Sequence, residues 1–158
     1  MNMQEGCFFL FCKITDVDGS WLIEAGCMIS LGGNEVKLVG TRTEQALREQ
    51  LILSNKTLFE DTDKAAFLTY IREKFPGLET AYILHWIPEQ EEDFYKILIN
   101  DSIVVDIEMP RLAQKNPIIK SILLVPQYRL RLSKVNQIKL AVAMNLAGST
   151  LIQDRGFS

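Results

Sequence analysis

The sequence predicts an α+β fold in which helices pack on a mainly antiparallel sheet. Segments with strand character and segments with helix character come in blocks and do not alternate, which disfavours a doubly wound parallel sheet. Neighbouring strand-like segments are separated by short turn motifs such as Asp18-Gly19 and Asn100-Asp101, and such turns join antiparallel strands. The chain has 158 residues, a length that fits a single domain over residues 1–158.

The first part of the chain predicts a β-meander. Residues 7–15 are apolar on both faces and predict a central strand. Residues 20–30 and 35–40 predict two further strands, which follow turns at 16–19 and 31–34.

Two helices are expected after the meander. Thr41 and Glu44 form a capping-box pattern, so a helix is expected to begin directly after the threonine. We expect it to end near Asn55, in the polar Asn-Lys-Thr sequence. A second helix is expected from about 62 to 74, with Pro76 preventing its continuation.

The second half of the chain predicts further strands and one C-terminal helix. Alternation, apolar runs and turn residues mark the strands, which are expected at 81–87, 94–100, 102–109 and 118–125, with an edge strand at 128–132. The last helix is expected at roughly 134–147, capped by Ser133 and closed by Gly148, with residues 148–158 forming a loose tail.

Composition places the protein among ordinary globular proteins. It is 47% hydrophobic and 23% charged with a net charge of −3, and no run is long enough to cross a membrane. The apolar run near the start lacks the basic residues of a signal peptide. Cys7, Cys12 and Cys27 form an odd set without disulfide spacing. We therefore expect a cytoplasmic protein that does not bind membranes.

Motifs for catalysis, metal ions and cofactors are missing from the sequence. It lacks a phosphate-binding loop, a nucleophile elbow and a Cys-x-x-Cys pair, so neither a metal nor a cofactor is expected. His85 is the single histidine and lies in an apolar strand-like segment, which is typical of a structural histidine. The expectation is a protein that is not an enzyme, although a small enzyme that uses His85 is an alternative.

Charge is distributed unevenly along the chain. Residues 79–109 hold one lysine and eight acidic residues, whereas residues 110–158 hold eight basic residues and one aspartate. These two segments could neutralise each other if their strands are neighbours. The basic excess is too small to predict direct binding of nucleic acid by a protein that is acidic as a whole.

The most unusual local feature is the acidic stretch 89–93, Glu-Gln-Glu-Glu-Asp. A solvated loop between two strands is one explanation. Aromatic residues border the stretch, however, and aromatic side chains beside charge of one sign are typical of a specific protein interface. The predicted partner-binding residues are Trp86, Glu89, Glu91, Glu92, Asp93, Tyr95, Asp106 and Glu108.

An acidic face favours a basic protein partner, because opposite charge accelerates association. The expected function is therefore that of an immunity or antitoxin-type inhibitor, which neutralises a basic toxin or nuclease by covering its surface. The alternative is a structural or assembly subunit, such as a homodimer formed through the strands expected at 118–125 or 128–132.

Overall fold

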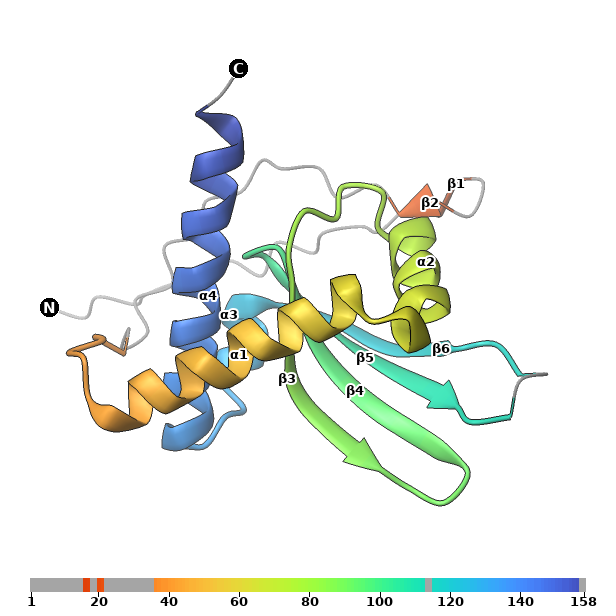
Figure 1. Cartoon of the computed structure of the whole chain (residues 1–158), viewed down its shortest axis with the longest axis horizontal. Coiled ribbons are helices and arrows are strands. Elements are labelled where there is room, and N and C mark those ends of the chain that lie inside the picture. The colour runs from red at the N-terminus through yellow and green to blue at the C-terminus, as the bar shows by residue number, and fades with distance from the viewer. Residues whose placement is uncertain (1–15, 18–19, 22–35, 113–114, 157–158) are drawn as a thin grey trace, which may run out of the picture.

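The computed structural model describes residues 16–17, 20–21, 36–112 and 115–156. Figure 1 shows a four-stranded antiparallel sheet in the order β3-β4-β5-β6, with helices packed against both of its faces. Its strands are β3 (Ala81–Pro88), β4 (Glu92–Ile99), β5 (Ile103–Pro110) and β6 (Ile118–Leu124). The helices are α1 (Arg42–Glu60), the 3-10 turn η1 (Thr62–Lys64), α2 (Ala65–Lys74), α3 (Val125–Arg129) and α4 (Lys134–Arg155). The α+β class and the antiparallel sheet are confirmed.

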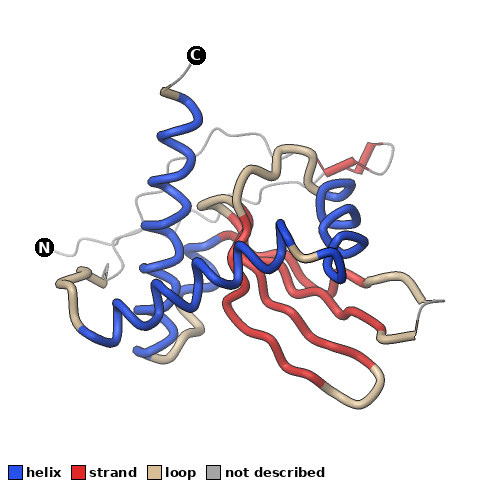
Figure 2. The backbone as a smooth tube through the Cα atoms, viewed as in Figure 1, coloured by secondary structure: helices blue, strands red, loops and turns tan. Residues whose placement is uncertain are grey.

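Each face of the sheet carries its own hydrophobic core. Successive strand residues point to opposite faces, so the odd-numbered apolar residues of β4 and β5 pack with α2, and the even-numbered ones pack with α3 and α4. Helix α1 joins the two cores, because Leu58 lies in the first and Leu51 in the second. The helices gather near one end of the strands, and the β3–β4 hairpin extends away from them (Figure 2).

The expected N-terminal meander lies largely outside the described residues. The described part pairs β1 (Asp16–Val17) with β2 (Ser20–Trp21) as an antiparallel hairpin. The strand expected at 35–40 is wrong for its described residues 36–40, which form no strand. Instead, Glu44 accepts hydrogen bonds from the backbone N–H groups of Val39 and Gly40. This segment therefore serves as the approach to α1.

The capping box at Thr41 is confirmed, but the expected end of the first helix is wrong. Thr41 Oγ1 accepts a hydrogen bond from Glu44 N at 3.2 Å, and α1 then continues past Asn55 to Glu60. Asn55 does not interrupt the helix, because its side chain donates to Ala81 O on β3 at 2.9 Å. Burial of Leu58 stabilises the extra turn.

The edge strand expected at 128–132 is also wrong. Residues 125–129 form the short helix α3, with Pro126 in its first turn, where proline is tolerated. Burial of Tyr128, 5% exposed, holds this helix against the sheet. The packing of Tyr128 therefore outweighed the strand tendency of an alternating pattern that is only five residues long.

The expected end of the last helix at Gly148, with a loose tail after it, is wrong as well. Helix α4 runs through Gly148 to Arg155. Ala147 and Leu151 are buried on either side of the glycine, and their packing outweighs its helix penalty of about 1 kcal/mol. None of the described helices is both long enough and apolar enough to span a membrane.

Candidate protein-binding surface

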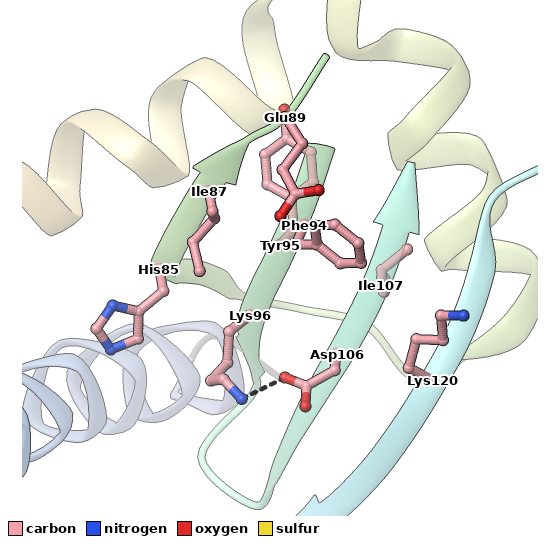
Figure 3. Close-up of a pocket in the computed structure, with 9 residues that line it drawn as sticks. All are labelled: His85, Ile87, Glu89, Phe94, Tyr95, Lys96, Asp106, Ile107 and Lys120. Carbon is pink, nitrogen blue, oxygen red and sulfur yellow. Dashed lines mark ion pairs between the residues drawn. The ribbon is translucent and has the colours of Figure 1, made fainter. Parts of the chain in front are cut away.

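Towards the β3–β4 hairpin, the α3/α4 side of the sheet is only partly covered by helices within the described part of the chain. The even-numbered residues of β4 and β5 pack under α3 and α4 only near the helical end of the strands. Towards the hairpin, the same face presents polar and partly exposed apolar side chains (Figure 3). We call this surface the open face; it comprises His85, Ile87, Glu92, Phe94, Lys96, Asp106 and Glu108.

A β-bulge determines which β3 residues reach the open face. The pairing with β4 shifts between Ile83 and His85, so the usual alternation of side chains is interrupted there. After the bulge, His85 pairs with Lys96 and Ile87 pairs with Phe94. Without the bulge, Trp86 would occupy the open face in place of Ile87.

The open face forms a shallow depression of about 370 Å³. Ile87 and Phe94 lie side by side in it, and Ile87 is 56% exposed. Glu89 from the hairpin turn and Lys120 from β6 border the depression (Figure 3). We call Ile87 and Phe94 together the apolar shelf; charged groups of both signs border it.

Ion pairs across neighbouring strands neutralise part of this surface. Lys96 Nζ lies 2.6 Å from Asp106 Oδ1, and Ser121 Oγ donates to Asp106 Oδ2 at 2.8 Å. Lys120 Nζ lies 2.5 Å from Glu108 Oε2, and this contact raises the pKa of Lys120. The pair of Glu108 with Lys120 joins the acidic segment 79–109 to the basic segment 110–158, as does the pair of Asp93 with Arg111.

Glu92 and Glu108 lie near each other on the open face, and each shifts the pKa of the other. The neighbouring Glu108 carboxyl group is the main cause that raises the pKa of Glu92, and burial adds to it. The pKa of Glu108 is lowered, mainly by its contact with Lys120. Lys120 therefore balances the charge of Glu108, whereas Glu92 makes no ion pair with a described residue.

Trp86 and Tyr95 lie on the opposite face of the sheet. Their rings stack with centroids 6.4 Å apart and planes inclined by 8°. Tyr95 is only 3% exposed, and Lys64 Nζ donates to its hydroxyl at 2.7 Å. Trp86 is 57% exposed, so of these two aromatic residues it is the one a partner can contact.

The predicted partner-binding residues therefore do not form one continuous surface. Glu92, Asp106 and Glu108 lie on the open face, and Glu89 borders it. Glu91 lies exposed in the hairpin turn. Asp93 occupies the other face with Trp86 and Tyr95, where Arg111 binds it at 2.7 Å. The acidic stretch begins as a turn and becomes part of β4.

His85 is partly buried at the border between the open face and α4. Burial lowers its pKa, with further contributions from Lys139 and Lys96 that outweigh the opposing charge of Asp106. Within the described part of the chain, His85 makes no hydrogen bond to a carboxylate; Asp106 is bound by Lys96 and Ser121 instead. The cysteines that could pair with His85 lie outside the described residues.

Sequence reasoning missed the apolar part of the surface. Ile87 and Phe94 read as ordinary strand residues, and Lys96 and Lys120 were not selected at all. A lysine within an otherwise apolar strand is the signal that could have revealed where the sheet face becomes exposed to water.

No protein-family model, curated protein or solved structure matches this chain.

Proposed function

We propose that this protein is a non-enzymatic, cytoplasmic inhibitor of the immunity or antitoxin type. It binds a basic toxin or nuclease through the open face and the adjoining hairpin turn. The partner is inhibited because its own functional surface is covered, without any chemical step in this chain. The charge and the exposed apolar side chains of this surface, and not similarity to a known inhibitor, support this class.

The observation that carries the proposal is the combination of apolar shelf and excess negative charge on the open face. Ile87 and Phe94 supply apolar area that a partner can remove from water. Counting Glu89, four carboxyl groups share two lysines in direct ion pairs, and Lys115 and Lys139 lie beyond these pairs at the margins of the face. A basic protein complements this charge and would be steered towards it.

Both edges of the described sheet are protected against strand addition, which favours binding through the face. On β3, the side chains of Asn55 and Ser54 bind the outer backbone groups of Ala81 and Ile83, and Pro88 offers no N–H group. On β6, a bulge that contains Lys120 interrupts the pairing with β5. Bulges, lysines and prolines are known devices that prevent edge-to-edge association.

Affinity capture from the source cells tests this function. We would compare the wild-type bait with a charge-reversed variant, Glu89→Lys/Glu91→Lys/Glu92→Lys. The matched control is Glu49→Lys/Glu73→Lys/Glu79→Lys, which makes the same charge change at exposed sites outside the open face and hairpin. A basic protein retained by the wild type and the control, lost by the reversed variant and released by salt, is the expected result. Equal retention by all three baits would refute it.

Assembly as a homodimer is the second candidate, favoured by the exposure of Ile118 (48%) and Leu124 (38%) on the edge strand β6. The sheet-edge version based on residues 128–132 is excluded, because Tyr128 and Arg129 belong to α3. Light scattering on the isolated protein distinguishes the two functions. A dimer of about 36 kDa, twice the 18.0 kDa of the chain, that is lost on Ile118→Lys would favour assembly.

A further inference from the structure

We propose that the partner presents an arginine to the open face, with its side chain over Phe94 and its guanidinium group between Glu92 and Glu108. This inference rests on the proposed function and specifies the chemistry of the partner. It concerns one side chain, so it can fail while the inhibitor function stands.

The sheet register places Phe94 at the centre of this site. Ile87 is its neighbour on β3 and Glu108 its neighbour on β5. Glu92 precedes it by two residues on the same strand and therefore on the same face. Directly opposed residues on neighbouring strands lie about 5 Å apart. The Phe94 ring therefore has Ile87 on one side, and the carboxyl groups of Glu92 and Glu108 are its neighbours along β4 and on β5.

The two carboxyl groups are close enough for each to shift the pKa of the other. Lys120 balances Glu108 from the side of β6, and Glu92 makes no ion pair with a described residue. The pair of carboxylates can therefore accept a further cation. A guanidinium group from a partner can bind both carboxylates at once.

Arginine suits this arrangement better than lysine does. Its planar guanidinium group stacks on an aromatic face and binds two carboxylates through its fixed fork of N–H donors. Its methylene groups can lie along Ile87, which is 56% exposed. The lysine ammonium is more strongly hydrated and has no flat surface to place on Phe94.

The charge of Glu92 gives the proposal a distinctive signature. A guanidinium group binds the ionised carboxylate, so protonation of Glu92 at low pH should weaken the binding. The other charged groups that act on the pair are Glu89 from the turn, Lys120 from β6 and Lys115 from the segment between β5 and β6. Binding should consequently tighten as the pH rises through the raised pKa of Glu92.

The test uses the full chain and three octapeptides of alternating glycine with arginine, lysine or citrulline. Citrulline has the shape of arginine without its charge. NMR titration should show binding of the arginine peptide with shifts at Ile87 and Phe94, about fivefold weaker binding of the lysine peptide, and no binding of the citrulline peptide. Equal binding of the arginine and lysine peptides would overturn the proposal.

Two pairs of variants locate the site. Glu92→Gln and Ile87→Ala should each weaken binding of the arginine peptide about threefold to tenfold. Their controls, Glu49→Gln and Ile52→Ala, alter an exposed glutamate and a 49% exposed isoleucine on α1 and should leave binding unchanged. Binding of the arginine peptide by the wild type should weaken as the pH is lowered, and Glu92→Gln should lose the part of this pH dependence that Glu92 causes. An unchanged pH dependence in Glu92→Gln would contradict the proposal.

Failure of this inference is distinguishable from failure of the proposed function. A captured basic partner whose affinity does not change on Glu92→Gln would refute the arginine site and leave the inhibitor function standing. Binding of the arginine peptide without any basic partner in the cell extract would support the site and refute the inhibitor function.

Discussion

Replacing Asn100 should destabilise the strands that carry the open face. Asn100 lies in the turn between β4 and β5 with a φ of 52°, in the left-handed region. Its Oδ1 accepts hydrogen bonds from the backbone N–H groups of Glu79 at 2.9 Å and Thr80 at 3.0 Å. Its Nδ2 donates to Gly77 O at 2.9 Å. One side chain thus fastens the β4–β5 turn to the segment that leads into β3.

The magnitude follows from these contacts. The bonds to Glu79 and Gly77 are exposed and are worth about 0.5 kcal/mol each, since water replaces them; the partly buried bond to Thr80 is worth about 1 kcal/mol. Alanine at this φ adds about 1 kcal/mol of backbone strain. Asn100→Ala should therefore cost about 3 kcal/mol of unfolding free energy. Asn100→Gly should cost about 2 kcal/mol, because glycine adopts positive φ without strain.

Urea unfolding followed by circular dichroism measures both variants. With a dependence of about 2 kcal/mol per molar urea, Asn100→Ala should lower the midpoint by about 1.5 M and Asn100→Gly by about 1 M. The control is Asp101→Ala, an exposed position in the same turn, which should shift the midpoint little. A midpoint loss for Asn100→Ala no larger than that of the control would refute the reasoning.

Three further perturbations test the core, the open face and the histidine. Leu58→Ala removes a fully buried side chain between α1 and the α2 core and should cost about 3 kcal/mol in urea unfolding; a cost below about 1 kcal/mol would contradict that packing. Asp106→Asn leaves Lys96 without its ion pair. Because both side chains are about one-third exposed (29% and 32%), the free energy of unfolding should fall by only about 1 kcal/mol, and by less in high salt. A loss of unfolding free energy that salt does not reduce would argue against the ion pair. Since the pKa of His85 is lowered from its ordinary value of 6.5, its contribution to stability is present above about pH 6.5 and is lost as the pH falls towards the folded pKa. His85→Gln should therefore weaken the decline of the urea midpoint between pH 7.5 and 5.5, and an unchanged decline would show that His85 does not cause it.

Local signals in the sequence were sufficient for elements whose residues all favour the same structure. The capping box of Thr41 and Glu44 located the start of α1, and the turn at Asn100 separated β4 from β5. The residues at which the helices end were harder to predict, because tertiary packing determines them. Asn55 and Gly148 are both typical of helix ends, yet burial of Leu58 and Leu151 carries each helix past them.

The candidate surface was only partly predictable because two bulges determine which side chains share a face. The shift between Ile83 and His85 places Ile87 on the open face and Trp86 on the other. The second shift, near Lys120, lies beside the ion pair with Glu108. A bulge depends on how two strands meet and leaves no fixed pattern in one strand alone. The acidic composition of the region was visible in the sequence, whereas its division between two faces was not.

Photo-cross-linking in the source cells tests directly whether the open face binds a basic partner. A photoreactive phenylalanine analogue would replace Ile87 on the open face or, as a control, Ile52 on α1; both positions are about half exposed. We expect a cross-link from position 87 to a basic protein, none from position 52, and loss of the cross-link when Glu89 and Glu92 are reversed to lysine. No cross-link from position 87, or equal cross-linking from both positions, would contradict the claim that the open face binds a basic partner.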